Sequence, residues 1–176
     1  MGLLQICVIG LRIDFINPNR SKPLTTKQTR LLDEQMNVTE KLIISHHQAI
    51  NEADTEAYFN TICFPFTYHR YDGRFYRISC IENYKKDYPM PWELIKNHEL
   101  DWSYTELEEL EEVVKTETKL TYKLAARRIN SEGKTGSIFQ AIWVLGHNDN
   151  MWGVQVRYDL GVFSNNNGLA GIINNL

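Results

Sequence analysis

Apolar and polar residues alternate in three long runs along the last third of the chain. The runs cover residues 119–129, 137–146 and 152–159, and the two breaks between them are short and rich in Asn, Asp, Gly and Ser. Alternation with period two between turn-forming breaks is typical of β-strands that follow one another as hairpins. The middle run is apolar on both faces, so we expect it to be the central strand of the sheet.

Helical spacing comes earlier in the chain. Apolar residues recur on one face between residues 38 and 53, which predicts an amphipathic helix beginning near Asp33 or Asn37. Asp54 or Thr55 can cap a short second helix. A third helix is expected over 82–96, bent or split by its two prolines. Helices followed by a meander predict an α+β fold, with a strongly curved, mostly antiparallel sheet wrapped around N-terminal helices.

Two segments between the helices and the late strands need a decision. Asp72-Gly73 separates two short strand-like runs and predicts a type I′ hairpin turn. Residues 103–116 contain five Glu residues between Glu106 and Glu112, and their spacing fits a helix. The β-forming residues at the end of this segment lead into the first late strand, however. We therefore expect residues 110–116 to pair with 119–129 as a hairpin.

The composition indicates the general class of the protein but says little about its chemistry. The 176 residues suit one domain, with 43% hydrophobic and 23% charged residues, as in ordinary globular chains. The net charge of -3 argues against nucleic acid as a partner, because phosphate binding needs a basic face. Three cysteines without paired spacing predict neither a disulfide framework nor a zinc site.

The two ends of the chain differ from its middle. Residues 1–33 carry turn signals and little periodicity, and we interpret them as an N-terminal extension; residues 163–176 are expected to form a mobile polar tail. The apolar stretch near the start is too short to span a bilayer and lacks the features of a signal peptide. We expect a cytoplasmic protein with no membrane partner, whose domain covers residues 34–162.

Four segments of this domain resemble the SnoaL-like branch of the nuclear transport factor 2-like superfamily. They are 49–54 (AINEAD), 63–66 (CFPF), 125–130 (AARRIN), and 143–145 with 152–157 (WVL and WGVQVR). The resemblance implies a cone-shaped fold in which helices close the mouth of the sheet over an apolar cavity. It also implies that the outer face of the sheet pairs two subunits as a homodimer. The superfamily includes isomerases, cyclases, dehydratases and pure binding modules, so the resemblance bears on the fold rather than on one function.

His46 is the first candidate for chemistry. It shares the apolar helix stripe with Leu42, Ala49 and Ile50, so its ring should point into the cone, where it could act as an acid, a base or a ligand-orienting group. The alternative is a core histidine hydrogen-bonded to the backbone. The neighbouring His47 is expected at the edge of the helix.

His69 is the second candidate. Steroid-isomerase relatives place a carboxylate base in this region of the fold, whereas residues 67–71 offer none, and Asp72 is explained by its turn. If the protein has a catalytic base, His69 or His46 must supply it. A structural role for His69 stays open.

Several further residues are candidates for ligand binding. Gln155 and Arg157 share one face of the last strand by parity and could hold a carboxylate or carbonyl group if that face is concave. If the face is convex, they are solvated or belong to a dimer interface. The other candidates are aromatic: Tyr58, Phe66, Tyr68, Tyr122 and Trp143.

Two functions therefore remain from the sequence. The first is binding of a small apolar ligand in the cone, with or without proton transfer by a histidine. The second is a dimerisation or protein-interaction module whose cone is filled by its own aromatic residues. No metal-ligand spacing, phosphate loop or nucleophile motif occurs, so neither a metal nor a cofactor is predicted.

Overall fold

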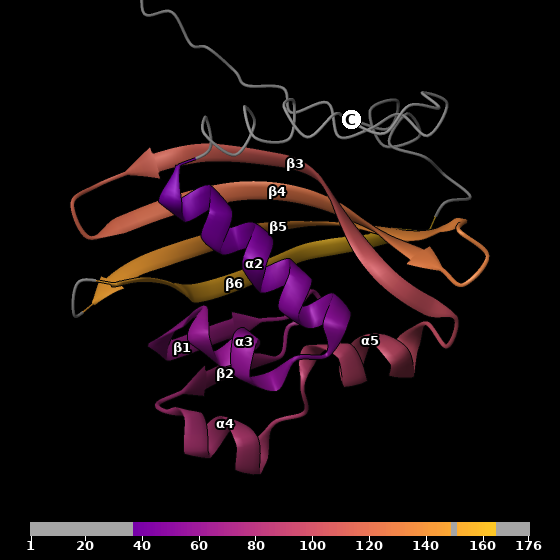
Figure 1. The fold of residues 1–176 in the computed structure, drawn as a ribbon, viewed down its shortest axis with the longest axis horizontal. Helices are drawn as coiled ribbons and strands as arrows, with labels where there is room; N and C mark the ends of the chain where they lie inside the picture. Colours follow the sequence, from indigo (N-terminus) through magenta and orange to yellow (C-terminus); the bar gives the residue numbers. More distant parts are fainter. Residues whose placement is uncertain (1–36, 149–150, 165–176) are drawn as a thin grey trace, which may run out of the picture.

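The computed structural model describes residues 37–148 and 151–164 (Figure 1). Its helices are α2 (Val38–Glu52), α3 (Thr55–Asn60), α4 (Ile81–Asp87) and α5 (Pro91–His98). Its strands are β1 (Ile62–His69), β2 (Phe75–Ile78), β3 (Trp102–Lys115), β4 (Lys119–Asn130), β5 (Thr135–Asn148) and β6 (Met151–Ser164). The predicted extension over 1–33 and residues 165–176 of the predicted tail lie outside the described residues. Phe163 and Ser164, which were predicted to begin the tail, are instead the last residues of β6 and pair with β5.

The helix boundaries follow from local capping. The Asn37 side chain accepts hydrogen bonds from the backbone N–H groups of Thr39 and Glu40, and the Glu40 carboxylate accepts one from the Asn37 N–H. This reciprocal arrangement satisfies donors that a helix start leaves free. At the start of α3 the Asp54 side chain accepts a hydrogen bond from the Ala57 N–H, without a reciprocal bond. Both predicted starting points are confirmed, and the two prolines split the predicted third helix into α4 and α5.

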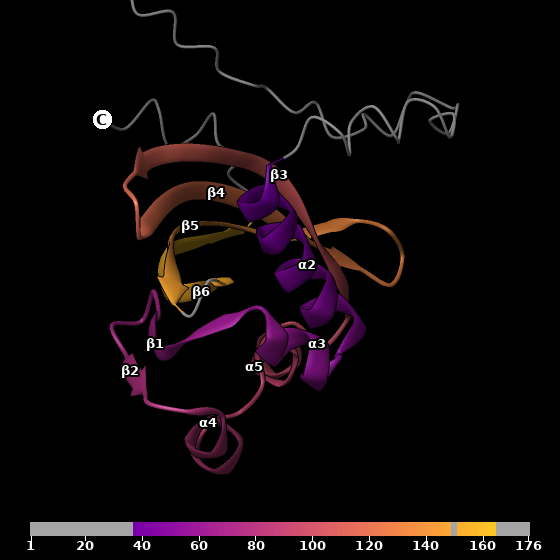
Figure 2. The same cartoon turned by 60° about the vertical axis from the view of Figure 1, so that its left-hand side comes forward.

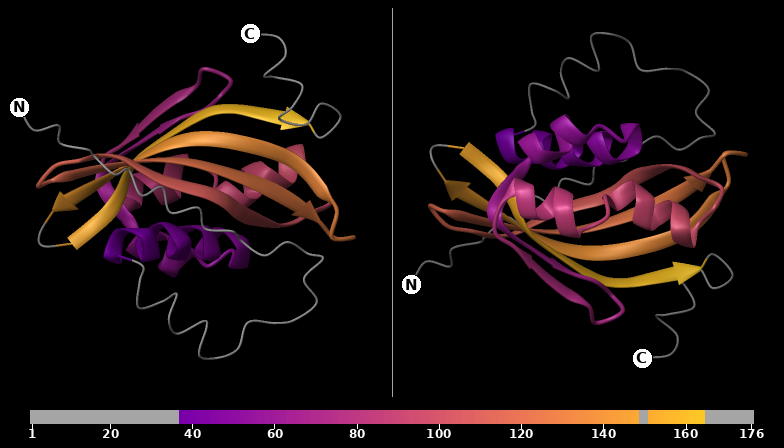
Figure 3. Two further views of the ribbon diagram at one scale, coloured as in Figure 1. Left: turned by 90° about the horizontal axis from the view of Figure 1, so that it is seen from above. Right: turned by 90° about the horizontal axis from the view of Figure 1, so that it is seen from below.

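The six strands form one open, curved sheet in the order β2-β1-β6-β5-β4-β3. All neighbours are antiparallel except β1 and β6, which run parallel. Figure 2 shows the sheet curling around the helices, and Figure 3 shows α2 lying along one side of it. The predicted α+β class and curved, mostly antiparallel sheet are confirmed, and β5 has a neighbour on both sides as expected of a central strand.

The turn between β1 and β2 differs from the predicted type. The Gly73 N–H donates to the Arg70 carbonyl at 3.0 Å, and the Arg70 N–H donates to the Arg74 carbonyl at 2.8 Å. Gly73 has φ of +83°, whereas Asp72 is not in the left-handed region. A type I′ turn needs both, so that prediction is wrong; the pattern is a type I turn followed by a glycine bulge.

The Glu-rich segment is a strand along its whole length. β3 pairs with β4 from Trp102 to Lys115, beyond the predicted 110–116. Thr105 and Leu107 are buried, whereas Glu106 and Glu108 are half-buried. The alternation of a half-buried strand is therefore present in the same residues that show helical spacing. Pairing with a long neighbour decides the outcome against local propensity.

Aromatic residues fill the space between the helices and the inner face of the sheet. The largest fully buried side chains are those of Trp143, Tyr58, Tyr122 and Phe66. On β5 the inner residues alternate with half-buried outer ones, as a sheet with one covered face requires. The cone is thus packed along most of its length, and open volume is left at one end.

A bulge in β6 decides which residues face that volume. Val156 pairs with Val144 and Val154 pairs with Leu145, which leaves Gln155 as an extra residue on its strand. A bulge of this kind breaks the period of two, so Val154 and Arg157 lie on the same, inner face although they are three residues apart. The sequence parity had placed Gln155 beside Arg157, and the bulge makes that prediction wrong.

Candidate functional site

The described residues enclose a pocket between α2, α5 and the inner side of the sheet. Its cavity volume is about 50 Å³, a few times what one water molecule needs. The walls combine apolar side chains with an unusual number of charged ones. The lining residues are His47, Ile50, Tyr68, Arg70, Tyr71, Pro91, Leu94, Ile95, His98, Thr105, Arg128, Phe139, Arg157 and Asp159.

Arg157 forms the floor of the pocket. It pairs with Trp143 across the sheet, is only 7% exposed, and its guanidinium carbon lies 4.9 Å from the Tyr68 ring centre and 5.0 Å from that of Trp143. Cation–π contacts of this kind stabilise a cation without using its N–H donors. The Nε and Nη1 atoms of Arg157 have no hydrogen-bond partner within the described structure. A buried guanidinium with free donors is costly unless another group supplies the acceptors.

Asp159 brings the opposite charge to the same floor. It lies two residues beyond Arg157 and accepts a hydrogen bond from the Tyr68 hydroxyl at 2.8 Å through Oδ2, while its buried Oδ1 is left without a partner in the described part of the chain. Burial, and then the nearby carboxylate, raises the pKa of Tyr68. Tyr68 therefore stays protonated and acts as the donor.

The two adjacent histidines of α2 sit behind and beside the floor. The His46 Nδ1 and the Thr61 hydroxyl are 2.7 Å apart, and that hydroxyl already donates to the Tyr58 carbonyl at 2.6 Å. Thr61 can only accept from His46, so the proton of the neutral imidazole is on Nδ1. His46 is fully buried and does not line the pocket.

His47 stacks on Trp143, with ring centres 4.9 Å apart and planes 9° apart, and it does line the pocket. It is buried rather than at the helix edge, which corrects the prediction for this residue. Burial and then Arg157 lower the pKa of His47 to about 3, and the same causes, together with His47, lower the pKa of His46 well below its usual value. Both rings are neutral at ordinary pH.

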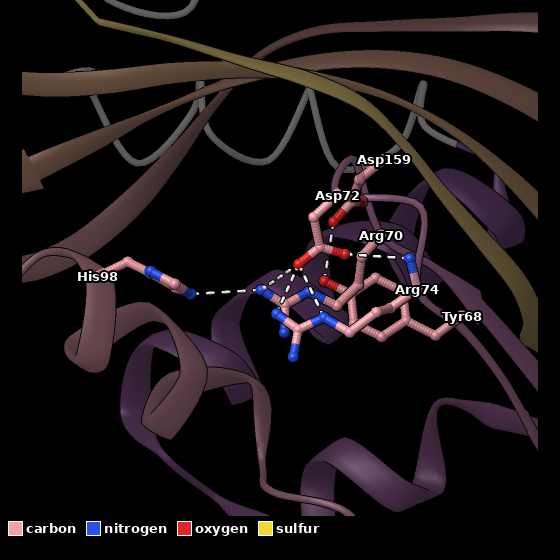
Figure 4. A network of polar contacts seen from close by, with 6 residues as sticks. All are labelled: Tyr68, Arg70, Asp72, Arg74, His98 and Asp159. Carbon is pink, nitrogen blue, oxygen red and sulfur yellow. Dashed lines mark hydrogen bonds and ion pairs between the residues drawn. The ribbon is translucent and has the colours of Figure 1, made fainter.

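The rim of the pocket carries a second polar group, drawn in Figure 4. Arg70 is buried at the end of β1 and lies 3.3 Å from both the His98 Nε2 and the Asp72 Oδ2. Arg74 also donates to Asp72, and this contact is the main reason why the pKa of Asp72 falls to about 2. The turn that ends β1 thus holds Arg70 over the pocket, with Asp72 as a carboxylate partner that Arg70 shares with Arg74.

The opposite wall is built in the same way around Arg128. Its guanidinium stacks over Phe139 at 5.5 Å and forms an ion pair with Glu99, which also accepts from the Ser137 hydroxyl. Burial would raise the pKa of Glu99, but the contacts with Ser137 and Arg128 lower it overall. Of the three arginines that line the pocket, only Arg157 has no carboxylate partner among the described residues.

The residues proposed from the sequence fall into three groups. Arg157 and Tyr68 line the pocket together. His46, Tyr58, Phe66 and Trp143 are fully buried around it as core residues, and Tyr122 is buried nearer the start of α2, where its hydroxyl lies 2.8 Å from that of Thr39. Gln155 and His69 do not line the pocket: Gln155 accepts from Lys119, and the His69 ring stacks on the exposed Tyr158 at 4.3 Å.

Sequence reasoning missed three of the groups that shape the pocket. Asp159 shares the parity of Arg157 and could have been found by extending the same face by one step. Predicting that His47 lines the pocket required knowing how α2 is oriented relative to the sheet. Arg70 was out of reach, because its position depends on the turn and on a contact with the distant α5.

Neither a metal-binding cluster nor a membrane-spanning helix is found in the described ranges. No group of three or more His, Cys, Asp or Glu side chains in residues 37–148 and 151–164 could hold a metal ion. None of the helices in those ranges is long and apolar enough to cross a membrane.

Comparison with known proteins identifies the fold. No family model matches the sequence, and no curated protein matches it either. A protein with a cystatin-like fold from Caulobacter vibrioides is 9% identical, with a TM-score of 0.54 over 78% of this chain and 96% of its own. A candidate ketosteroid isomerase from Shewanella frigidimarina is 13% identical, with a TM-score of 0.52 over 68% and 91%.

A further solved structure, an NTF-2-like protein of unknown function from Shewanella oneidensis, is 10% identical, with a TM-score of 0.51 over 69% of this chain and 94% of its own. Identities this low support a shared fold and not a shared activity. The resemblance seen in the sequence is therefore confirmed at the level of architecture: the chain has the NTF2-like, cystatin-like cone fold.

Proposed function

We propose that this chain is a small-molecule-binding domain whose ligand enters the open end of the cone. The observation that carries the proposal is Arg157, a buried guanidinium that lines this pocket and whose Nε and Nη1 have no hydrogen-bond partner among the described residues. Apolar side chains of α2 and α5 supply a surface for the rest of the ligand, among them Ile50, Leu94 and Ile95. A few fixed polar groups within apolar walls are typical of ligand sites.

Proton transfer by a histidine receives less support than binding. His69 lies away from the pocket and His46 lies behind Trp143. His47 lines the pocket, but its low pKa makes it a weak base. A neutral imidazole there can still orient a ligand by a hydrogen bond through its unpartnered Nε2. A catalytic form of this domain would therefore use His47 before either predicted base.

The test is a ligand screen with a variant that blocks the pocket. Leu94 is half-buried on α5, and Leu94→Trp should fill the cavity, whereas Lys96→Trp places the same ring on the exposed side of the helix. Ligands should raise the thermal midpoint of the wild type and of Lys96→Trp, since binding at 100-fold above Kd adds about 2.7 kcal/mol to native-state stability. Leu94→Trp should abolish the effect. A ligand that stabilises all three proteins equally would place its site elsewhere.

Association through the outer face of the sheet is a second candidate function, favoured by an apolar stripe. Ile142 pairs with Tyr158 and Val144 pairs with Val156 on that face, and Phe75 extends it through the β1–β2 hairpin. Tyr158 is 42% exposed and Phe75 is 58% exposed. Apolar patches of this kind are common at subunit interfaces.

Sedimentation analysis of the full chain tests this homodimer. Tyr158→Glu should convert a dimer to a monomer, because it places a charge in the middle of the stripe. Leu100→Glu is the matched control, since Leu100 is exposed but lies in the turn after α5. A wild type that is monomeric at every accessible concentration would remove this candidate.

A further inference from the structure

The floor of the pocket carries free donors and a free acceptor side by side. Arg157 and Asp159 are two residues apart on β6, opposite the buried Trp143 and Ala141, so both belong to the inner face. Arg157 keeps Nε and Nη1 unpartnered, and Asp159 keeps Oδ1 unpartnered. No ion pair joins the two side chains in the described part of the chain. Each therefore needs a partner of its own.

The surroundings fix how these groups are presented. Tyr68 and Trp143 hold the guanidinium between their rings, and the Tyr68 hydroxyl occupies only Oδ2 of the carboxylate. Both polar groups are thus oriented by packing before any ligand arrives, and such preorganisation lowers the entropy that binding costs.

Charge balance limits what can bind there. Arg128 is paired with Glu99, and Arg70 is paired with Asp72. Asp72 also pairs with Arg74, but the extra positive charge of that group lies on the exposed Arg74 side chain, which does not line the pocket. Arg157 and Asp159 also sum to zero. A ligand with several negative charges is disfavoured, while one that brings an acceptor to Arg157 and a donor to Asp159 satisfies both.

We infer that the pocket binds the polar end of a small carboxylic acid that carries a hydrogen-bond donor on the adjoining carbon. This inference rests on the proposed small-molecule function and names its ligand class. The carboxylate accepts hydrogen bonds from Arg157, a pairing that the planar guanidinium suits. The donor, a hydroxyl or an ammonium group, binds Asp159. α-Hydroxy acids and α-amino acids share this arrangement, and a cavity of about 50 Å³ accepts a group of that size.

Specificity for the donor follows from the cost of leaving Asp159 unpaired. A site built to pair a hydroxyl or amine rejects the analogue that lacks it, because the buried partner then loses its hydrogen bond to water without gaining another. An acid without the donor should therefore bind at least about ten-fold more weakly than its hydroxy or amino counterpart.

A three-carbon series tests the ligand class on the full chain by NMR titration. The probes are L-lactate, L-alanine, propionate and L-lactamide, which differ only in the donor or the carboxylate. We expect lactate or alanine to bind at least ten-fold more tightly than propionate and than lactamide. Equal binding of propionate would overturn the role of Asp159, and equal binding of lactamide would overturn the role of Arg157. In either case the small-molecule function would stand.

Two variants separate the sources of the donor. Asp159→Asn keeps an acceptor oxygen but removes the charge, so an amino-acid ligand should lose at least ten-fold in affinity and a hydroxy acid much less. Arg157→Met should remove the binding of both, while Arg77→Met, on the exposed side of β2, should change neither. If Arg157→Met does not fold, the wild-type series and Asp159→Asn still decide the matter. Should the whole series fail while neutral apolar compounds bind the pocket, this inference falls alone; if nothing binds, the proposed function falls with it.

Discussion

Ala53 ends α2 in the left-handed backbone conformation, which glycine adopts more easily than alanine. Its φ is 54° and its ψ is 33°, the left-handed region that helix ends often adopt, and its N–H donates to the carbonyls of Ala49 and Ile50. The left-handed conformation costs an L-residue with a Cβ about 1–2 kcal/mol, and glycine largely avoids this cost.

Ala53→Gly should therefore stabilise the protein by about 0.5–1 kcal/mol, after allowing for the greater freedom of glycine in the unfolded chain. Ala57→Gly is the control, because Ala57 lies inside α3, and there glycine should destabilise by about 1 kcal/mol. Urea unfolding of the three proteins measures both changes. A loss of stability in Ala53→Gly would contradict the assigned helix end.

Among single residues, the sequence allowed prediction of those whose role depends on the local pattern of polar and apolar positions. Arg157 and Tyr68 were identified as candidates because polar or amphipathic side chains stand out among apolar strand residues. Gln155 was misplaced because the bulge depends on pairing with β5, which the sequence of β6 does not reveal. The orientation of His47 depends on how α2 packs against Trp143.

β6 and β1 approach each other closely at Gly153. A Cβ at Gly153 would lie 2.7 Å from the Cys63 nitrogen and 2.9 Å from the Cys63 Cβ. A Cβ at Gly146, which faces Gly153 across β5 and β6, would meet the ends of two flexible side chains, Gln155 at 2.8 Å and Lys119 at 3.1 Å. The two glycines are thus paired in register and differ in what surrounds them.

Gly153→Ala should destabilise the protein by roughly 1–3 kcal/mol, because backbone atoms must move to admit the methyl group. Gly146→Ala should cost less than about 1 kcal/mol, since the Gln155 and Lys119 side chains can adopt other rotamers. Thermal unfolding followed by circular dichroism compares the two. Equal losses would show that β-strand context, rather than the approach of β1, sets the cost.

Element types were predictable wherever one pattern dominated. The capped helices and the three late strands carry unopposed signals, and all are confirmed. The Glu-rich β3 carried two signals at once, and its full length was missed because only its last residues favour strand by themselves. Asn51 of α2 holds the earlier part, exchanging hydrogen bonds with the Thr105 backbone at 2.8 and 2.9 Å. A contact over such a sequence distance leaves no local trace.

The stability of the whole molecule should depend on pH through its two buried histidines. His46 and His47 have lowered pKa values in the folded protein, about 3 for His47, against about 6.5 in the unfolded chain. Between the folded and unfolded pKa values the unfolded state binds more protons than the folded state. The contribution of the two neutral histidines to the free energy of unfolding is therefore fully present above pH 6.5 and is lost as the pH falls toward the folded pKa.

We expect the free energy of unfolding to fall between pH 6.5 and pH 4.5 by up to about 1.4 kcal/mol per pH unit for each histidine. His47→Gln should reduce the slope of unfolding free energy against pH by the contribution of one histidine. Denaturant unfolding at a series of pH values gives both slopes. Because the pKa of Asp72 falls to about 2, that carboxylate adds its own loss mainly below this window. A flat profile down to pH 4.5 would contradict burial of neutral imidazoles.

The extra residue in β6 has a consequence for how such a pocket can arise and disappear. Arg157 faces inward because one residue, Gln155, is looped out of the alternation between Val154 and Arg157. Removing Gln155 would leave Val154 and Arg157 two residues apart in strict alternation and still on the same face, whereas loss of the bulge at the present strand length would turn either the valine or the arginine to the opposite face. The side chains that face the inside of this cone therefore depend on the bulge in β6 as well as on the residue types of the strand. Comparisons of related chains that count only substitutions would miss a change of the inward-facing residues made by gaining or losing a bulge.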